Sequence, residues 1–368
     1  MVTRPLLLHS LLDPASVHRL DLPAWDLLIR QGRRANLLSR LAFVLEADLA
    51  RIPEAPRHHL NGALMVAQRQ IQTTRWEAAC IQAALAPLGV LPVMLKGAAY
   101  LLAGMPASRG RLFGDVDILV PKARIEAVEA ALLAHGWAFS DDLDAYDQRY
   151  YRDWMHEIPP LGHAQRGTSL DVHHTILPPT ARVKVNTAAL FEDLRPVDGC
   201  PGIRVLAPTA MFLHSAAHLF HEGELDKGLR DLFDLDALLR DFSNDSRFVA
   251  ELLPRAQHLG LTRPLYYALR YCQRWLGTPV PDGLMAAVAQ VAAPGALTLW
   301  LMDACYDRAL RPVHPSCNTA GTGLARLALY VRSHWLRMPA GLLVGHLARK
   351  AWGRLSPPPP PAPADQAP

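Results

Sequence analysis

The sequence lacks the cysteine pattern of a thiolate metal site or of a disulfide-stabilised secreted domain. Its 368 residues include five cysteines, which are scattered and form no Cys-x-x-Cys pair. An odd, dispersed set of this kind is typical of reduced thiols in the cytoplasm. The N-terminus has a short apolar patch, but acidic residues soon follow, so it does not resemble a signal peptide. We therefore expect a cytoplasmic protein.

An unbroken membrane-spanning segment is also missing. The stretch 283–302 carries no charged residue, and its length is about that of a spanning helix. Pro294-Gly295 interrupts this stretch near its middle, and proline followed by glycine ends a helix rather than continuing it. We expect two short buried helices here and no transmembrane segment.

A strong excess of charge of one sign is absent as well. The 38 basic and 34 acidic side chains leave a net charge of +4, which suits phosphate-bearing ligands without demanding nucleic acid. The segment 323–355 is the exception, because it has no acidic residue and several basic ones. They are Arg326, Arg332, Arg337, Arg349, Lys350 and Arg354. We expect a solvated basic helix face, with contact to an anionic membrane or to nucleic acid as the alternative.

Three blocks and a tail follow one another along the chain. Residues 1–88 have apolar residues at three- and four-residue spacing and are predicted to be helical. Residues 89–185 alternate strands with helices, and residues 186–355 return to helical spacing. The proline-rich tail 356–368 is expected to be disordered. The expected fold class is α+β, with an α/β core built on a mixed sheet between an N-terminal helical region and a C-terminal helical domain.

Within the core, short apolar runs predict the strands. They are 91–97, 113–120, 150–160 and 168–177, the last two forming a hairpin, with an amphipathic helix over 122–137. Two aspartates interrupt the second run. Asp115 and Asp117 share one face of that strand, because successive strand side chains alternate. Buried carboxylates are costly unless paired or bound to metal, so a divalent cation is expected between them; two solvated acids on an edge strand are the alternative.

A third acid and a glycine complete a set suited to phosphate chemistry. Asp171 is the acid of the strand 168–177, and His173 shares its face. Gly97 ends the strand 91–97, where a glycine lets backbone N–H groups approach phosphate oxygens. Mg²⁺ is bound by few carboxylates, and a two-metal site uses a third to bind the second ion and activate the attacking hydroxyl. The ordered set indicates phosphoryl or nucleotidyl transfer.

Four stretches carry a resemblance to a known family. LKGAAYLL, RLFGDVDILV, LDVHH and KGLRDLFDLDALL resemble the motifs of the bacterial uncharacterised nucleotidyltransferases, in the superfamily typified by DNA polymerase β and kanamycin nucleotidyltransferase. The resemblance covers about residues 90–240. It implies the minimal nucleotidyltransferase fold, a mixed sheet with helices, followed by a helical domain.

The resemblance also implies roles for individual residues. Asp115 and Asp117 would bind metal, and Asp171 would bind metal or act as the base. Lys96 and Gly97 would face the triphosphate. The turn departs from the superfamily pattern, which usually has Gly-Ser or Gly-Gly, because alanine follows the glycine here and a phosphate-binding hydroxyl is missing.

Further polar residues are candidates for the site. Arg109 and Arg111 lie in the loop before the Asp-Val-Asp strand, and arginine is suited to bidentate phosphate contacts; solvated loop arginines are the alternative. Arg230, Asp231 and Asp234 recur in the family's helical segment, and the two aspartates lie one turn apart. They would face the cleft or form salt bridges along the helix.

Histidines raise two further hypotheses. His173 is expected to orient Asp171 or to touch substrate. His214, His218 and His221 share one helix face, which is a spacing compatible with zinc. No acid or cysteine lies at a fitting position on that helix, so a substrate-facing or core role is favoured.

The leading hypothesis is an Mg²⁺-dependent nucleotidyltransferase that binds two ions, with Mn²⁺ as the alternative metal. It would move an NMP from an NTP to a hydroxyl of an acceptor and release pyrophosphate. The acceptor is open between a protein side chain, a small molecule or sugar, and an RNA end. A catalytically silent nucleotide-binding or interaction module is the second hypothesis. A DxD glycosyltransferase is the third, and it is disfavoured because no repeated βα units precede the DxD.

Overall fold

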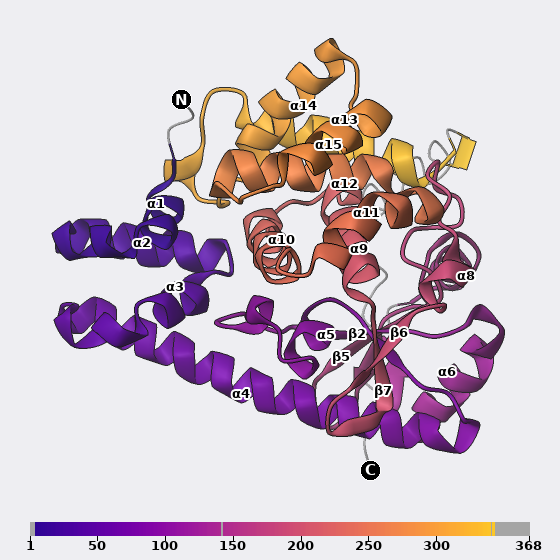
Figure 1. Cartoon of the computed structure of the whole chain (residues 1–368). Coiled ribbons are helices and arrows are strands. Elements are labelled where there is room, and N and C mark those ends of the chain that lie inside the picture. The colour runs from indigo at the N-terminus through magenta and orange to yellow at the C-terminus, as the bar shows by residue number, and fades with distance from the viewer. Residues whose placement is uncertain (1–3, 141–142, 340, 343–368) are drawn as a thin grey trace, which may run out of the picture.

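The computed structural model describes residues 4–140, 143–339, 341 and 342. In Figure 1 a β-sheet occupies one side of the molecule, the long helix α4 runs beneath it, and the C-terminal helices lie above. The buried apolar side chains form one continuous cluster, from the N-terminal helices through the sheet to the C-terminal helices. The predicted tail 356–368, and Arg349, Lys350 and Arg354 of the basic segment, lie outside the described residues.

The N-terminal region is helical, as its apolar spacing predicted. Its helices are α1 (Leu6–Leu12), α2 (Leu22–Arg34), α3 (Leu38–Val44) and α4 (Glu54–Leu85). Helix α2 begins after Asp21, whose side chain accepts a hydrogen bond from the backbone N–H of Ala24 at 2.9 Å. Such a cap satisfies one of the free donors of the first helical turn. Helix α4 contacts the sheet and buries Glu77, which accepts a hydrogen bond from Arg166 at 2.7 Å.

A mixed seven-stranded sheet forms the core, which confirms the predicted fold class. Its strands are β1 (Val93–Met94), β2 (Asp115–Leu119), β3 (Trp137–Phe139), β4 (Leu161–His163), β5 (Ser169–His173), β6 (Leu194–Val197) and β7 (Cys200–Leu206). Their order across the sheet is β3-β4-β5-β2-β1-β7-β6. Strands β2 and β5 are parallel neighbours, and Asp117 is in register with Asp171. The sheet therefore brings the predicted acids of two distant motifs side by side.

Four helices connect the strands of the sheet. They are α5 (Lys96–Leu102), α6 (Ile125–Ala134), α7 (Ala145–Arg149) and α8 (Thr187–Leu190). The predicted amphipathic helix over 122–137 corresponds to α6, which is followed by Gly136 at φ +87°. Glycine adopts this left-handed conformation without the steric cost that other residues meet, so it ends the helix.

Two predictions of local structure were wrong. The segment 150–160 was expected to be a strand, but α7 continues into a π-helical turn over Tyr150–Trp154, and only a single bridge joins Glu157 to His173. The capping box at the start of α7 explains the helix, because it favours helix over the strand preference of the aromatic residues. Strands β6 and β7 were missed, since residues from 186 onward were expected to be helical.

The C-terminal region is helical after β7. Its helices are α9 (Pro208–His221), α10 (Gly228–Phe242), α11 (Ser246–Leu259), α12 (Thr262–Tyr271), α13 (Asp282–Ala292), α14 (Ala296–Ala309) and α15 (Thr322–Arg337). Helix α9 begins at its proline, as predicted, and is buried along most of its length. It packs against α10, α11, α12 and β7 and so joins the sheet to the helical region.

The uncharged stretch 283–302 forms two helices, as expected, but they are not buried as expected. Helices α13 and α14 meet at an angle of 112°. Leu297 is 72% exposed and Trp300 is 65% exposed. Within the part of the chain that the structure describes, no single helix has both the length and the hydropathy of a membrane span, although this bent pair passes on length and composition.

Candidate active site

The base of the site is the pairing of β2 with β5. Asp117 and Asp171 are directly opposed across these parallel strands, and alternation puts Asp115 on the same face as Asp117. One ligand atom from each of Asp117, Asp171 and His173 lies within 4.8 Å of the others. The predicted third acid thus belongs to the same cluster as the Asp-Val-Asp motif, together with the histidine that shares its face.

Asp117 is almost fully buried and is held by two nitrogen donors. Its Oδ1 accepts hydrogen bonds from Lys96 Nζ at 2.5 Å and from His173 Nε2 at 3.0 Å. Burial alone would raise the pKa of Asp117, but Lys96 and His173 outweigh it and hold that pKa well below its usual value. Asp117 is therefore ionised, and its pairing with Lys96 offsets the repulsion between neighbouring acids.

His173 links Asp117 to a second carboxylate. Its Nδ1 lies 3.2 Å from Glu157 Oε2, and the ring of His156 stacks on it with the centroids 5.2 Å apart. Burial opposes a charged imidazole, but the Glu157 and Asp117 carboxylates together raise the pKa of His173. His173 is thus positioned between two carboxylates. The contacts from Glu157 to His173 and from His173 to Asp117 fix the orientation of the Asp117 carboxylate.

Asp171 is in a different electrostatic state from Asp117. Burial raises its pKa to about 7, and the nearby carboxylates of Asp117 and Glu157 add to this effect. A carboxylate poised near neutral pH exchanges protons readily, which is the property of a general base. Asp171 is only partly buried and lies beside Asp117, but it does not line the cavity that opens above the carboxylates.

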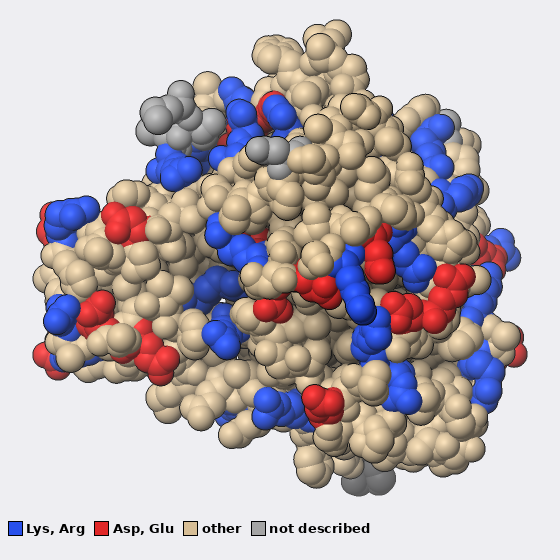
Figure 2. Space-filling model, viewed as in Figure 1, with Lys and Arg blue, Asp and Glu red and all other residues tan. Residues whose placement is uncertain are grey.

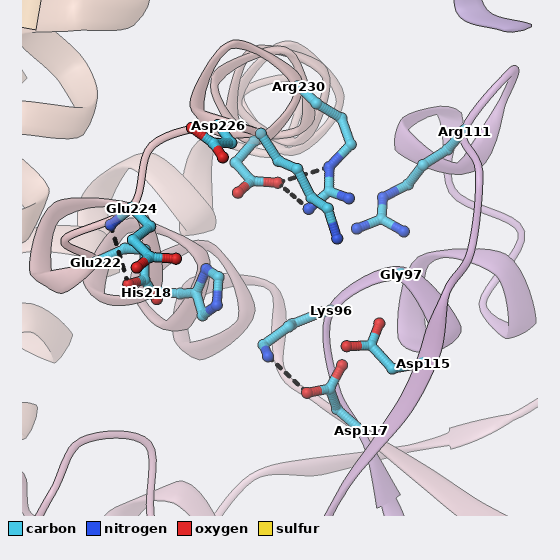
Figure 3. A pocket seen from close by; sticks show the side chains of 12 residues that line it. Lys96, Gly97, Arg111, Asp115, Asp117, His218, Glu222, Glu224, Asp226 and Arg230 are labelled. Carbon is cyan, nitrogen blue, oxygen red and sulfur yellow. Dashed lines mark hydrogen bonds and ion pairs between the residues drawn. The ribbon is translucent and has the colours of Figure 1, made fainter. Parts of the chain in front are cut away.

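A cavity of about 350 Å³ opens above the carboxylates. Its basic side chains are Lys96, Arg111, Lys227 and Arg230. Its acidic side chains are Asp115, Asp117, Glu222, Glu224, Asp226 and Asp231. Figure 3 shows Asp115 and Asp117 at the base, with the guanidinium groups of Arg111 and Arg230 approaching from two different elements. The cavity thus presents carboxylates beside cationic groups, which is the pairing that a metal–polyphosphate ligand needs.

Gly97 has no side chain, and this leaves space for the guanidinium group of Arg111 in the cavity. A Cβ atom at position 97 would lie 2.1 Å from Nη1 of Arg111, far inside contact distance. The preceding residue, Lys96, has φ +46°, which is uncommon for a residue other than glycine. The glycine that the sequence predicted for phosphate approach thus also makes room for a guanidinium group.

Asp234 anchors two buried arginines. Its Oδ2 accepts a hydrogen bond from Arg111 Nε at 2.8 Å, and its Oδ1 accepts one from Arg40 Nη2 at 2.9 Å. Burial opposes the charge on Arg111, but Asp234 outweighs it and raises the pKa of that guanidinium. Asp234 is buried and does not line this cavity, but it lines a small adjoining one of about 20 Å³ together with Arg111 and Arg230. It therefore positions Arg111 beside the larger cavity.

Of the remaining predicted residues, some line the cavity and one does not. Arg230 and Asp231 form an ion pair in the cavity wall, with Nη2 and Oδ1 2.5 Å apart. Arg109 is exposed and is not among the residues that line the cavity. His218 reaches into the cavity (Figure 3).

The histidines of helix α9 do not form a metal cluster. Burial lowers the pKa of His214 to about 3 and that of His221 to about 4, so both are neutral packed side chains. Among the described residues, the groups with metal-ligand spacing contain none of the three α9 histidines. The substrate-facing or core reading fits this arrangement.

Sequence reasoning missed Arg40, Glu157 and His156. Arg40 lies in an amphipathic helical segment and meets Asp234 across 194 positions of the chain, so no local pattern marks it. Glu157 and His156 fell in the segment expected as a strand. The sequence did hold a signal for Glu157 and His156, because the predicted hairpin between 150–160 and 168–177 would have placed them near His173. The acidic residues of the loop after α9 were also passed over.

The donor set fits a hard divalent cation. Asp117 and Asp171 belong to a group with metal-ligand spacing, and Asp115 lies on the same strand face; all three carry the carboxylate oxygens that Mg²⁺ prefers. Asp117 Oδ1 accepts hydrogen bonds from both Lys96 and His173. Its Oδ2 accepts no hydrogen bond from any described residue and is therefore available to a cation. These three aspartates would hold the metal, and Lys96 neutralises part of their charge.

A mixed sheet that joins an Asp-x-Asp strand to a third acid on a parallel neighbour, beside a cavity lined by acidic and basic side chains, is typical of the nucleotidyltransferase class. A family model described as "Uncharacterised nucleotidyltransferase" matches residues 21–277, which is more than half of the chain. The chain belongs to this family. No curated protein gives a significant match to the sequence.

Proposed function

We propose that the protein transfers a nucleoside monophosphate from an NTP to a hydroxyl group of an acceptor and releases pyrophosphate. The observation that carries this proposal is the register of β2 with β5, which sets Asp171 beside Asp117, next to a cavity lined by both acidic and basic side chains. A silent module with the same fold would have no need of three acids on adjacent strands, where their repulsion costs stability.

Different residues would act on the two substrates: basic side chains of the cavity on the triphosphate, and Asp171 on the acceptor hydroxyl. Lys96, Arg111 and Arg230 bind the triphosphate through its non-bridging oxygens, and arginine suits this contact because its donors match phosphate geometry. Asp171 accepts the proton of the acceptor hydroxyl as the new bond from oxygen to the α-phosphorus forms. The bond from the α-phosphorus to the oxygen that bridges the α- and β-phosphates breaks, and pyrophosphate leaves toward Arg111 and Arg230.

The metal supplies charge neutralisation at the triphosphate and favours the ionised acceptor hydroxyl when it is bound. The chain's own residues orient the reaction. His173 and Glu157 keep Asp117 in place, and Asp234 keeps Arg111 in place. Because Asp171 lies outside the cavity lining, the acceptor approaches from the β5 side.

The test uses each of the four α-labelled NTPs with Mg²⁺ and a cell extract as the source of acceptors. Asp115→Asn is the informative variant, because Asp115 is exposed and makes no hydrogen bond to a described residue, so its loss leaves the fold intact. Label transferred by the wild type and not by Asp115→Asn would support the proposal. Calorimetry with NTP and Mg²⁺ separates the alternatives, since neither transfer nor binding by a folded wild-type protein would favour the silent module.

A further inference from the structure

A surface on the C-terminal helices exposes large apolar side chains. On α14 these are Leu297, Trp300 and Leu301, and on α15 they are Leu324, Leu327 and Val331. The two helices pack against each other. Monomeric proteins expose such side chains singly as a rule, so a gathering of this kind marks a place of interaction. We call these six residues, together with Trp335, the apolar face.

The spacing on α15 shows that this exposure follows the helix. Leu324, Leu327, Val331 and Trp335 recur at intervals of three and four residues and form one exposed stripe. The residues that α15 buries, among them Leu329, lie on its other side. A helix that is apolar on both sides has a second apolar surface still to cover.

Basic side chains predominate around the apolar face. The two acids of α14, Asp303 and Asp307, are each paired with an arginine of the preceding helices, and the acids Glu224 and Asp226 lie at one edge of the face. From residue 308 to residue 339 the chain has arginines but no acidic residue. Arg182 adds to them, because its guanidinium lies 3.8 Å from the ring centroid of Trp335. The stretch 283–302 has no charge at all. In Figure 2 the protruding top of the molecule, where α13 and α14 meet in Figure 1, is correspondingly tan.

We propose that the apolar face docks on the surface of an anionic lipid bilayer. Exposed apolar side chains with tryptophan, flanked by arginines and with the acids of α14 already paired, match a membrane interface, where the rings lie at the headgroup level and arginine meets lipid phosphate. The bend of 112° between α13 and α14 suits helices that lie on a bilayer rather than cross it. An acidic protein partner would match the arginines but not the uncharged stretch beside them.

Docking there would bring the bilayer close to the candidate active site. A second cavity, of about 380 Å³, is lined by Leu327 and Tyr330 of α15 and by Glu224 and Asp226. The same two acids line the catalytic cavity. One loop therefore separates the apolar face from the site. The proposal itself does not depend on nucleotidyl transfer, and its test measures no activity.

The test is flotation of the full chain with vesicles of phosphatidylcholine mixed with phosphatidylglycerol, beside vesicles of phosphatidylcholine alone. We expect the wild type to float with the anionic vesicles and to be released by added salt. The variant Trp300→Gln/Leu324→Gln/Leu327→Gln is expected to bind them about tenfold more weakly, because it removes apolar contact.

The matched control is Met65→Gln/Val66→Gln/Trp76→Gln, which changes one tryptophan and two other exposed apolar residues on α4. It is expected to bind like the wild type, with both variants keeping the wild-type melting temperature. Three results would overturn the proposal: no flotation of the wild type, equal binding to both kinds of vesicle, or equal loss in the two variants. A wild-type dimer that dissociates in the α14–α15 variant, without vesicle binding, would instead assign the face to a second copy of the chain.

Discussion

Two buried charge clusters flank the cavity, and they are built with opposite balances. The sheet cluster consists of Asp117, Asp171, Glu157, Lys96 and His173. The arginine cluster consists of Arg40, Arg111 and Asp234. In the first, carboxylates outnumber the lysine and the histidine; in the second, two guanidinium groups share one carboxylate.

This difference explains how one cavity suits a ligand with two kinds of charge. Buried charges are tolerated when they are paired, so an excess on one side stays costly until a counter-charge arrives. The sheet cluster would be completed by a cation, and the arginine cluster by a phosphate. Gly97 lies where the two meet, since it contacts Arg111 and follows the lysine that pairs with Asp117.

The largest expected effect comes from breaking the arginine cluster. Asp234→Asn leaves Arg40 and Arg111 buried without their shared carboxylate, and we expect it to lower the free energy of unfolding by about 3–5 kcal/mol. Asp231→Asn is the control on the same helix, because Asp231 pairs with a single arginine in the cavity wall, and we expect a smaller loss of about 1–2 kcal/mol. Urea unfolding measures both losses; equal losses would mean that Asp234 is no more important than the acid of a single ion pair in the cavity wall.

The sheet cluster is tested by comparing its two aspartates. Asp117→Asn leaves Lys96 and His173 without the negative charge that they share, and we expect a loss of about 3 kcal/mol, partly relieved because the histidine can lose its proton. Asp115→Asn should change the stability by about 0.5 kcal/mol or less, since Asp115 is exposed. Both variants are expected to lose nucleotidyl transfer. If Asp115→Asn were the more destabilising of the two, the assigned environments would be reversed.

The sheet cluster was largely predictable and the arginine cluster was not. Asp117 and Asp171 interrupt apolar runs, and the period of two gives the face on which each lies, whereas Glu157 of the same cluster was missed. The family resemblance implied a mixed sheet, but the parallel pairing of β2 with β5 is a finding of the structure. The contact of Arg40 with Asp234 joins two amphipathic helices far apart in sequence, and helical spacing does not say which partner an arginine meets.

The strands of the sheet also divide into those that local sequence predicts and those that it does not. Strands β2 and β5 are apolar runs bounded by turn residues, and both were predicted. Strands β6 and β7 contain Pro196, Pro201 and Gly202, residues that are depleted in strands. They form nevertheless, because β7 pairs with β1 and β6 completes the edge beyond it. Tertiary pairing overrides local preference there.

Gly97→Ala tests the junction between the clusters. The added methyl group would overlap Arg111 Nη1, so the guanidinium must move; we expect a loss of about 1–3 kcal/mol in stability together with weaker NTP binding. Gly62→Ala is the control, because nothing lies within 4 Å of a Cβ there and alanine favours the helix by up to about 1 kcal/mol. Calorimetry and thermal unfolding measure the two effects, and unchanged NTP affinity in Gly97→Ala would remove Arg111 from the binding site.

The last expected effect is a gain in stability, and its size depends on pH. Because the pKa of Asp171 is raised to about 7, the folded protein holds a proton that the unfolded chain releases near pH 3.8. The folded state therefore loses stability from this group as pH rises through that window, and the loss is complete above about pH 7. Asp171→Asn removes the cost of the buried charge, so its stabilisation should be larger at about pH 8 than at about pH 5. Thermal unfolding in EDTA at the two pH values tests this expectation, and a stabilisation that is the same at both would mean that Asp171 is ionised throughout. A variant that is more stable at high pH yet inactive would show that Asp171 is kept at a cost to the fold.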